Sequence, residues 1–389
     1  MKIVNKNHIR VAVVQPFVVY GGGTEAITAW TIEALKLECH VTLISFTDVK
    51  AHELNRFYGT DIRENQFSLR HIKVPLILRY TSRFTVLKDH LMMRYCKSIN
   101  EHFDLFISIG GAMDFESKTI QYFALSPGSN LVKILRKGIE TSVGYYLLKK
   151  SFMRVCELIS NYSPSRVKNN ITLVASEWLG RLIDEIYSIT DYKVVYPPVQ
   201  SSSRATSWHS RTEGFLCVAR ISPEKQIERV VEIIKIVRSK GFHVTLHVVG
   251  RTDNHEYLKK IRQLSGENSY WLSIEEVLGK DELVKRMNEY KYGISAATGE
   301  PFGMAVAEMV QSGCIVFVSD TGGQREIVDM PELIFKDVHD AVGKIIETLN
   351  SSGSEMELIE CLETKGKRFS VQNFCHMIKK SVYEALDAK

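Results

Sequence analysis

The stretch that most constrains the fold is residues 9–46, which contain a strand, a glycine loop, a helix and a second strand. "IRVAVVQP" (9–16) is a short apolar run that ends after Pro16, and "HVTLISF" (40–46) is another. Between them, three consecutive glycines precede "TEAITAWTIEALKL" (24–37), whose apolar residues recur at helical spacing. Two strands joined by a helix run parallel, and parallel sheets belong to α/β folds. We therefore expect an α/β protein built on doubly wound parallel sheets.

The same alternation continues along the chain and divides it into two halves. Residues 200–214 between the halves are polar and without period, as is typical of a linker. At 389 residues the chain is also too long for one ordinary core. We expect a first domain over 1–199, a second over 215–366, and a C-terminal helix over 367–389 that crosses back to the first. The other expected strands lie at 67–74, 104–110, 119–125, 171–178, 193–199, 215–220, 243–250 and 314–320, with helices over 82–98 and 130–160.

The composition indicates a soluble globular protein, with 44% hydrophobic and 24% charged residues. No stretch approaches the roughly 18 uncharged apolar residues that a spanning helix needs. The first apolar run is short and followed by Pro16, so we expect a strand there and no signal peptide. The seven cysteines are scattered without a close pair, which favours free thiols in a reducing compartment. We expect a cytoplasmic protein.

The loop "VARISPEK" (218–225) is the first candidate site, because ligands of open parallel sheets bind beyond the carboxyl ends of the strands. Arg220 ends the expected strand, Ser222 has the character of a helix N-cap, and Pro223 suits the first helical position. Lys225 then falls at the third position, where the helix dipole disfavours a cation. Lys225 is either a solvated side chain or, with Arg220, one of two cations that bracket an anion at a helix N-terminus.

A second candidate is "TGEPFGMAVAEM" (298–309), which carries two glutamates around a Pro-Phe-Gly turn. Gly303 allows a tight entry into a packed helix, so Glu300 precedes the helix and Glu308 lies about two turns on. The two carboxylates then reach different parts of one extended ligand. We expect the backbone amides of 303–305 to point into the cleft between the two expected domains, where this ligand would bind. Alone, the pair is equally compatible with surface charge, but the Arg-Lys loop favours a shared ligand.

Together these motifs resemble the retaining, nucleotide-sugar-dependent glycosyltransferases of family 4, whose GT-B fold has two Rossmann-like domains facing across a cleft. The resemblance covers nearly the whole chain, and its most specific parts are the Arg-x4-Lys and Glu-x7-Glu patterns. "GGGTE" together with "VVYPPV" is most similar to the branch that builds lipid-linked oligosaccharides with mannose. The matching segments are "GGGTE" (21–25), "VVYPPV" (194–199), "VARISPEK", "VVG" (248–250), residues 277–328 and "KRFSVQNF" (367–374).

The resemblance implies a role for each candidate residue. Glu308 would hold the ribose hydroxyls of the nucleotide, and Glu300 would contact the donor sugar. Arg220 and Lys225 would neutralise the diphosphate and stabilise the charge that develops on it. Glu300, Arg220 and Lys225 form the expected catalytic set. The further substrate-binding residues are Gly22, Gly23, Gly250, Phe302, Gly303, Met304, Ala305 and Glu308.

The expected reaction is transfer of a hexose from a nucleotide-diphosphate sugar to a glycan or polyprenol-linked acceptor at the membrane surface. The resemblance favours mannose from GDP-mannose, and the alternative is a UDP-glucose, UDP-N-acetylglucosamine or UDP-galactose transferase of surface polysaccharide synthesis. A sugar diphosphate leaves as a stabilised anion, so cations can replace the acid that glycoside hydrolysis uses. The chain has no Asp-x-Asp motif, and we expect neither a metal nor another cofactor.

One departure from the family pattern concerns the acceptor side. Many members have a histidine near the end of a first-domain strand, and here Ala124 in "TIQYFALSPG" (119–128) takes that place. Whether Ser126 or another residue substitutes stays open, as does a non-catalytic nucleotide-sugar binding protein. A nicotinamide enzyme is disfavoured, although Asp48 ends the second strand, because the glycines are consecutive and the third glycine of the fingerprint is missing.

The charge is concentrated between residues 130 and 170, which hold eight Lys or Arg and two Glu, a local charge of +6 against +5 for the whole chain. The apolar residues beside them predict a helix pair on an anionic membrane surface. The alternative is that they pack into the core and the lysines are solvated. No nucleic-acid-binding module accompanies the charge, so we expect no nucleic-acid partner. The basic residues are Lys133, Arg136, Lys137, Lys149, Lys150, Arg154, Arg166 and Lys168.

Overall fold

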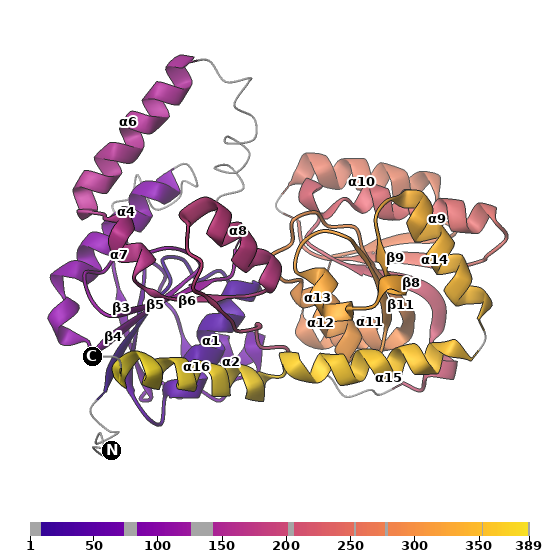
Figure 1. The fold of residues 1–389 in the computed structure, drawn as a ribbon. Helices are drawn as coiled ribbons and strands as arrows, with labels where there is room; N and C mark the ends of the chain where they lie inside the picture. Colours follow the sequence, from indigo (N-terminus) through magenta and orange to yellow (C-terminus); the bar gives the residue numbers. More distant parts are fainter. Residues whose placement is uncertain are drawn as a thin grey trace. The chain divides into compact units, whose positions relative to one another are not determined.

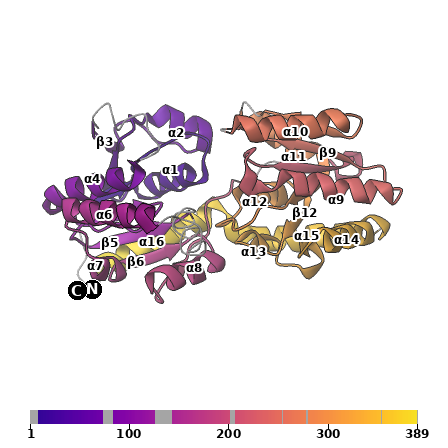
Figure 2. The same cartoon turned by 90° about the horizontal axis from the view of Figure 1, so that it is seen from above.

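The chain divides into two compact units. Unit 1 comprises residues 1–198 and 371–389, and unit 2 comprises residues 199–370. Helices cover both faces of a parallel sheet in each unit (Figures 1 and 2). The structure is a computed structural model, and it describes residues 9–73, 84–125, 143–200, 206–252, 254–276, 279–351 and 353–387.

The sheet of unit 1 contains seven parallel strands within the described residues, in the order β3-β2-β1-β4-β5-β6-β7. β1 lies inside this order, and its last four residues are buried on both faces of the sheet, as expected of a strand between two layers of helices. The expected doubly wound architecture is confirmed here. The strands are β1 (Arg10–Val14), β2 (His40–Ser45), β3 (Phe67–His71), β4 (Leu105–Ile109), β5 (Thr119–Phe123), β6 (Ile171–Val174) and β7 (Lys193–Val194).

Helices α1 and α16 lie side by side on one face of this sheet (Figure 2). Helix α4 packs on a cluster that includes Ala12, Val14 and Phe106, which alternate in β1 and β4 with the residues facing the other layer. The helices of unit 1 are α1 (Gly23–Leu35), α2 (Ala51–Tyr58), α4 (Thr85–Ser98), α6 (Val143–Ser160), α7 (Pro164–Lys168), α8 (Glu177–Tyr187) and α16 (Val371–Asp387).

The sheet of unit 2 has six parallel strands in the part of the chain that is described, in the order β10-β9-β8-β11-β12-β13. β8 begins at Thr212, which lies inside the predicted linker, and residues 201–205 of that linker are outside the described ranges. The strands are β8 (Thr212–Val218), β9 (Thr245–Val249), β10 (Leu272–Glu275), β11 (Tyr290–Ser295), β12 (Ile315–Ser319) and β13 (Ile334–Phe335).

Two of the helices of unit 2 begin at a capping side chain. Asn254 accepts a hydrogen bond from the amide of Tyr257 (3.0 Å), and Asp337 accepts one from Asp340 (2.9 Å). Each bond satisfies an N–H that has no partner inside its helix. The helices are α9 (Ile227–Ser239), α10 (His255–Glu267), α11 (Lys280–Glu289), α12 (Met304–Gln311), α13 (Gln324–Val328), α14 (Val338–Asn350) and α15 (Ser354–Gly366).

Helix α16 completes unit 1 although it lies at the far end of the sequence. It buries Phe374, Ile378 and Val382, and Phe374 meets the ring of Tyr122 from β5 at 6.3 Å between centroids. The carboxylate of Glu38 accepts hydrogen bonds from Lys379 (2.6 Å) and from Tyr383 of the same helix. Unit 1 is therefore assembled from two separate parts of the chain.

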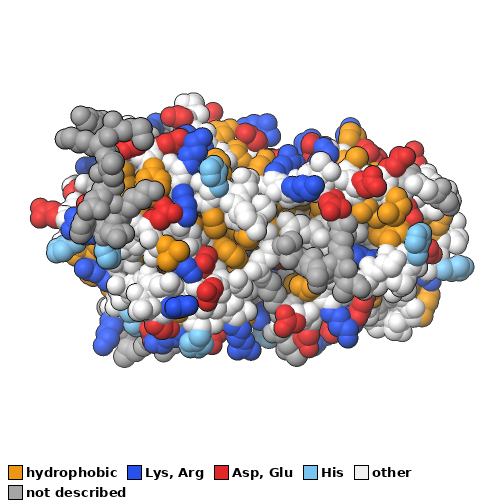
Figure 3. All heavy atoms as spheres, turned by 90° about the horizontal axis from the view of Figure 1, so that it is seen from below, with side chains coloured by type: hydrophobic (Ala, Val, Ile, Leu, Met, Phe, Trp, Pro, Cys, Tyr) orange, Lys and Arg blue, Asp and Glu red, His pale blue; other side chains and the backbone are white. Residues whose placement is uncertain are grey.

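The charge pattern of the described surface is mixed. Figure 3 shows acidic and basic side chains interspersed over one face. No helix among the described residues is long and apolar enough to span a membrane. Of the basic stretch 130–170 that the sequence singled out, residues 130–142 lie outside the described ranges, and α6 covers 143–160.

Candidate functional site

Four loops of unit 2 gather the residues that the second half of the sequence singled out. They follow β8, β9, β11 and β12, which are neighbours in the sheet. Because all these strands are parallel, the loops lie at one edge, beyond the carboxyl ends of the strands. The candidate site comprises these loops, at residues 219–226, 250–252, 296–303 and 320–323.

The loop after β8 differs from the expected helix start. Pro223–Lys225 form a short 3-10 turn, Gln226 is left-handed (φ 50°), and α9 begins only at Ile227. The hydroxyl of Ser222 donates to the carboxylate of Glu224 (2.7 Å) and does not cap the helix. Ser222 and Pro223 thus take the expected N-cap and first positions, but of this separate turn and not of α9, and the Ser222 side chain caps no amide. Lys225 closes that turn and lies outside the first turn of α9.

Lys225 and Glu300 are brought together by the fold. The ammonium of Lys225 forms an ion pair with the carboxylate of Glu300, and the two side chains are 19% and 21% exposed. The loops that carry them are also joined by a hydrogen bond from the amide of Thr298 to the carbonyl of Glu224 (3.2 Å). An ammonium has three N–H donors, so Lys225 can hold Glu300 and still present a proton to an anion.

Arg220 lies in the same loop and is exposed. Its guanidinium donates to the carboxylate of Glu224 at 2.8 Å. Burial would raise the pKa of Glu224, but the hydrogen bond from Ser222 and the nearby Arg220 and Lys225 outweigh it and lower that pKa. Glu224 therefore stays ionised and holds the guanidinium of Arg220.

Gly250 lets the loops after β8 and β9 pack together. A side chain at this position would overlap the carbonyl oxygen of Ala219. The same two loops are joined by a hydrogen bond from the amide of Ile221 to the carbonyl of Arg251 (2.8 Å). The hydroxyl of Thr252 also donates to the carbonyl of Ile221 (3.1 Å). The absence of a side chain at Gly250 thus fixes the loop that carries Arg220.

The loop after β11 enters α12 through Gly303, which has a positive φ of 109°. Phe302 is 3% exposed, and its ring packs edge-on against Phe369 at 5.4 Å between centroids. Phe302 can therefore face a ligand only with its backbone. Met304 and Ala305 are partly exposed in the first turn of α12, where amide N–H groups have no partner inside the helix.

Glu308 lies further along α12 and is partly exposed, between the buried Ala307 and Met309. Its carbonyl accepts hydrogen bonds from the amide (2.9 Å) and the hydroxyl (2.8 Å) of Ser312. Glu300 is in the loop before the helix. The two glutamates thus occupy different elements, as the sequence predicts, and Lys225 is paired with Glu300.

Sequence reasoning gave no role to the loop after β12, although this loop supports Glu300. The amide of Gly323 donates to the carbonyl of Glu300 at 2.7 Å. Gly322 has a positive φ of 81°, and a side chain there would overlap the backbone of Glu300. The consecutive glycines after the strand were the available signal for this close approach.

Gly22 and Gly23 belong to unit 1, where Gly22 caps α1 and Gly23 begins it. The buried carboxylate of Glu25 accepts hydrogen bonds from the amide of Val19 (3.2 Å) and the amide group of Gln15 (3.3 Å). A side chain at Gly22 would overlap this carboxylate. Glu25, which sequence reasoning left without a role, therefore shapes the glycine loop.

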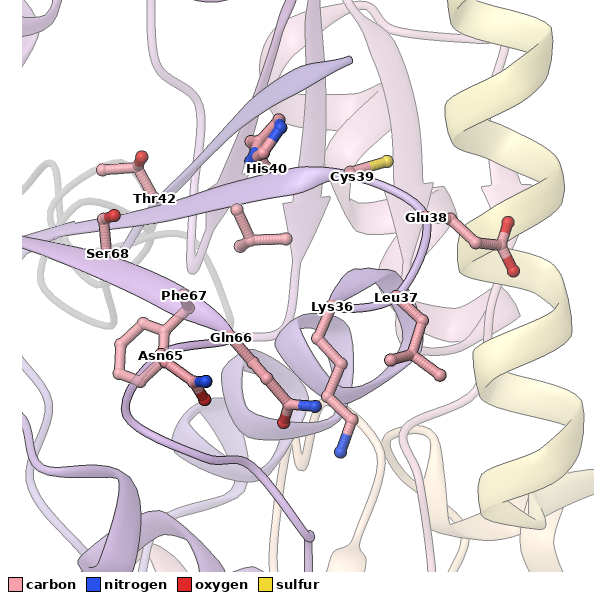
Figure 4. Close-up of a pocket in the computed structure, with 11 residues that line it drawn as sticks. Lys36, Leu37, Glu38, Cys39, His40, Thr42, Asn65, Gln66, Phe67 and Ser68 are labelled. Atoms are coloured by element: carbon pink, nitrogen blue, oxygen red, sulfur yellow. The ribbon is translucent and has the colours of Figure 1, made fainter. Parts of the chain in front are cut away.

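Ala124 directly follows β5 and is partly buried, at the carboxyl edge of the unit 1 sheet, while Ser126 lies outside the described residues. A cavity of about 370 Å³ occupies the opposite edge, at the amino ends of β2 and β3 (Figure 4). Lys36, Gln66 and Phe67 are among its lining residues. The cavity is therefore separate from the glycine loop of the same unit.

The two parallel Rossmann-like sheets define the GT-B fold, and solved structures agree. A glycosyltransferase from Rickettsia africae ESF-5 matches with a TM-score of 0.71, at 15% identity, over 98% of this chain and all of that one. The Anabaena protein HepE, solved in complex with UDP and glucose, matches with a TM-score of 0.67, at 12% identity, over 97% of this chain and all of that one. At such identities the likeness establishes the fold.

A family model matches the second half of the chain. Residues 200–364, somewhat less than half of the chain, match the model of the glycosyl transferases group 1 family. This match agrees with the resemblance noted in the sequence.

Curated relatives add a more distant similarity. A Caenorhabditis elegans protein named GDP-Man:Man(3)GlcNAc(2)-PP-Dol alpha-1,2-mannosyltransferase is 25% identical over 173 residues, which are 40% of this chain and 37% of that protein. The protein of the same name from Dictyostelium discoideum is 23% identical over 281 residues, 66% of this chain and 53% of that protein. The chain thus spans about a third to a half of these relatives' length.

Proposed function

We propose that this protein is a retaining glycosyltransferase that moves a hexose from a nucleotide-diphosphate sugar to a glycan or polyprenol-linked acceptor. The observation that carries the proposal is the Lys225–Glu300 ion pair, which lies between the loop after β8 and the start of α12. The pair sets a cation for the diphosphate directly beside a carboxylate for the sugar. The match of residues 200–364 to the model of the group 1 family supports the same reaction class.

The proposed chemistry follows from these charges. As the bond from the sugar to the diphosphate breaks, negative charge grows on the leaving phosphate oxygen. Lys225, Arg220 and the amide N–H groups in the first turn of α12 stabilise that charge. Glu300 accepts hydrogen bonds from hydroxyls of the donor sugar, and Glu308 accepts them from the ribose. A contact of Gly22 and Gly23 with the diphosphate stays a prediction from the family resemblance.

GDP-mannose is the donor that we favour. The names of the two curated relatives support it, since both contain GDP-Man. The complex of HepE with UDP and glucose supports the alternative of a UDP-sugar. Glucose, N-acetylglucosamine or galactose would then be the sugar that is transferred.

A binding panel tests the donor site. We would titrate GDP-mannose, UDP-glucose, UDP-N-acetylglucosamine and UDP-galactose by calorimetry into the wild type, Glu308→Ala and Lys225→Ala. One donor should bind selectively to the wild type, and both substitutions should weaken the binding of that donor. Glu232→Ala and Lys235→Ala are matched controls, because both side chains are exposed on α9 away from the loops. Equal losses in the controls, or no donor bound by the wild type, would contradict the proposal.

Metal-independent transfer is part of the proposal, because Arg220 and Lys225 supply the positive charge that a divalent ion would otherwise bring. We expect the initial rate of transfer to be unchanged by an excess of EDTA. A rate that falls in EDTA and returns with manganese would show that a metal carries the diphosphate. Magnesium-free and magnesium-supplemented wild type serve as the paired control.

A non-catalytic nucleotide-sugar binding protein is the second candidate, and Ala124 is the observation that favours it. Such a protein would bind a donor in the panel above but neither transfer nor slowly hydrolyse it. Release of the nucleoside diphosphate over hours, measured by chromatography with and without candidate lipid acceptors, separates the two candidates. Detectable release that Glu300→Gln slows strongly supports the enzyme.

We also propose peripheral binding to an anionic membrane through α6. Val155 and Leu158 are 53% and 81% exposed on this helix, next to the exposed Lys150 and Arg154. Residues 150, 154 and 158 share one face at helical spacing, so apolar and basic side chains are presented together. α6 lies beside α4 and extends beyond it (Figure 1).

The structure also removes one residue from the predicted basic surface. Arg166 donates to the buried carboxylate of Asp114 (2.8 Å), so its charge is already compensated. Lys133, Arg136 and Lys137 lie outside the described residues. In flotation with vesicles that contain phosphatidylglycerol at low salt, the double variant Val155→Ser and Leu158→Ser should bind less than the wild type. Equal binding by both, or none by the wild type, would contradict the membrane proposal.

A further inference from the structure

Gln324 is a fully buried amide next to the Glu300 loop. It is the first residue of α13, directly after Gly323, and its exposed fraction is 0%. A buried amide is unfavourable unless its N–H and C=O groups are hydrogen-bonded, so its partners decide what it holds in place.

The amide of Gln324 joins the ends of two neighbouring strands. Its nitrogen donates to the carbonyl of Ala297 (3.0 Å) and to the hydroxyl of Ser319 (2.7 Å). Its oxygen accepts a hydrogen bond from the hydroxyl of Ser295 (2.9 Å). Ser295 ends β11 and Ser319 ends β12, while Ala297 begins the loop that carries Glu300.

The same segment also contacts the middle and the end of the Glu300 loop. The amide of Gly323 holds the carbonyl of Glu300 at 2.7 Å. At the end of the loop, a side chain built on Gly303 would lie 3.2 Å from the Cβ of Gln324, so the backbone there packs closely on Gln324. The Glu300 loop is thus supported at its start, middle and end by Gln324 and the glycine before it.

The carbonyl of Ala297 is the main point of attachment. It also accepts hydrogen bonds from the hydroxyls of Ser319 (2.6 Å) and Thr321 (3.3 Å). Three donors from the β12–α13 segment therefore converge on one carbonyl, three residues before Glu300. This network fixes where the loop leaves the sheet and hence where the carboxylate of Glu300 meets Lys225.

We infer that Gln324 is a positioning residue that holds Glu300 in place for the donor sugar. The inference rests on the proposed function, because the role of Glu300 toward the sugar does. Gln324 is fully buried, so it acts through the loop and contacts no ligand itself. Its effect should therefore fall on the step in which the sugar must be placed, and not on binding of the nucleotide.

The first test replaces the amide with an apolar side chain of similar length, Gln324→Met. We expect kcat for transfer or donor hydrolysis to fall roughly tenfold to a hundredfold, because a displacement of about 1 Å of a catalytic group has an effect of this size. The Kd of the nucleoside diphosphate without sugar should stay within about twofold of the wild type, as Glu308, Arg220 and Lys225 are untouched.

A second variant, Gln324→Glu, keeps the shape and makes the hydrogen bonding depend on pH. The protonated acid can donate to Ala297, whereas the carboxylate cannot donate at all. Relative to the wild type, kcat of Gln324→Glu should rise as the pH is lowered. If Gln324 only stabilised the fold, kcat per folded molecule would not recover at low pH.

Asn288→Leu is the matched control. Asn288 is also a buried amide of unit 2, and it donates to the carbonyl of Val284 in α11 (2.9 Å), away from the four loops. This variant should lose stability with unchanged kcat. If Gln324→Met behaves like Asn288→Leu, with lower stability and full kcat, the inference is overturned.

Hydrogen exchange separates this inference from the proposed function. The amides of residues 298–300, 302 and 303 should exchange faster in Gln324→Met than in the wild type, and Asn288→Leu should leave them unchanged. This result is expected whether or not a donor is turned over. A wild type without turnover would defeat the proposed function, while unchanged exchange in Gln324→Met would defeat the positioning role by itself.

Discussion

Single glycines set the geometry of the candidate site. Gly250 is required where the loop after β9 meets the carbonyl of Ala219, and Gly322 where the loop after β12 meets Glu300. Only the second of these has a positive φ, so at Gly250 the requirement is purely one of space. A side chain at either position would move a loop that carries a proposed catalytic residue.

We predict that Gly250→Ala destabilises unit 2 by about 1–3 kcal/mol, since an added methyl group in a packed region forces the backbone to shift. Urea unfolding followed by fluorescence measures the change. Gly266→Ala is the control, because Gly266 lies in α10 and a side chain there meets nothing within 4 Å. The control should be neutral or slightly stabilising. Equal stability of both variants would refute the steric argument.

Glu300 and Glu308 should differ in what their removal affects. We predict that Glu308→Gln raises the Kd of the nucleoside diphosphate about tenfold or more, since a hydrogen bond to a charged group contributes about 1.5–3 kcal/mol. Glu300→Gln should leave that Kd unchanged and lower kcat by roughly a hundredfold. Calorimetry and steady-state kinetics on the two variants give both quantities. The assignment is wrong if the two defects are exchanged.

The sequence could predict which side chains carry charge at this site, but not what holds them. Lys225 was recognisable because it departs from the preference for an acid near a helix start. The structure shows why: a 3-10 turn separates Lys225 from α9 and turns it to Glu300. Gln324 could not be found this way, because its partners come from three segments that only the folded sheet brings together.

At the scale of elements, the alternation of short apolar runs with segments of helical spacing predicted ten of the thirteen strands in the described residues and missed β10, β11 and β13. β1, β2, β4 and β5 lie within the ranges expected for them, because parallel strands buried on both faces leave continuous apolar runs. Boundaries were less predictable. β8 starts three residues earlier than expected, since a strand that is exposed at its first residues has polar side chains there.

The α4–α6 contact of unit 1 has a buried histidine, which makes it sensitive to acid. Burial lowers the pKa of His90, and Lys97 lowers it further. The ring nitrogen Nδ1 lies 2.6 Å from the hydroxyl of Ser160 in α6, and the ring meets Tyr162 edge-on. His90 is therefore neutral in the folded protein at neutral pH.

We predict that this contact weakens in acid. Because the folded-state pKa of His90 is lowered, its contribution to stability is complete above the unfolded value of about 6.5 and is lost as the pH falls below it. The drop in Tm between about pH 7.5 and 5.5 should be smaller in His90→Gln than in the wild type. His52→Gln, an exposed histidine of α2, is the control and should keep the full drop. If Tm falls as much in His90→Gln as in the wild type, groups other than His90 cause the acid sensitivity.

At the scale of the whole molecule, the main feature is that α16, from the far end of the sequence, belongs to unit 1. Unit 2 is one continuous segment, 199–370, whereas unit 1 needs residues 371–389 in addition to 1–198. Each of Phe374, Ile378 and Val382 is buried, and burial of such a side chain stabilises by about 1.5–3 kcal/mol. The stability of unit 1 therefore depends on α16.

We predict that deletion of residues 371–389 lowers the unfolding transition of unit 1 and leaves that of unit 2 unchanged. Calorimetric unfolding of the deletion variant and of the segment 199–370 alone assigns the two transitions. A synthetic peptide of 371–389 added back should raise the lowered transition. If the deletion shifts both transitions equally, the two units unfold together and the division fails.

The late position of α16 also reverses the usual order of events on the ribosome. Domains generally fold in the order in which they are made, at about 5–20 residues added per second. Here residues 1–198 emerge first. The helix that covers the face beside α1 is synthesised only roughly 10 to 40 s later. Unit 2, residues 199–370, can be synthesised and fold during that interval. The half of the protein that is synthesised first is then completed last, and its open apolar face is what a nascent-chain chaperone would bind.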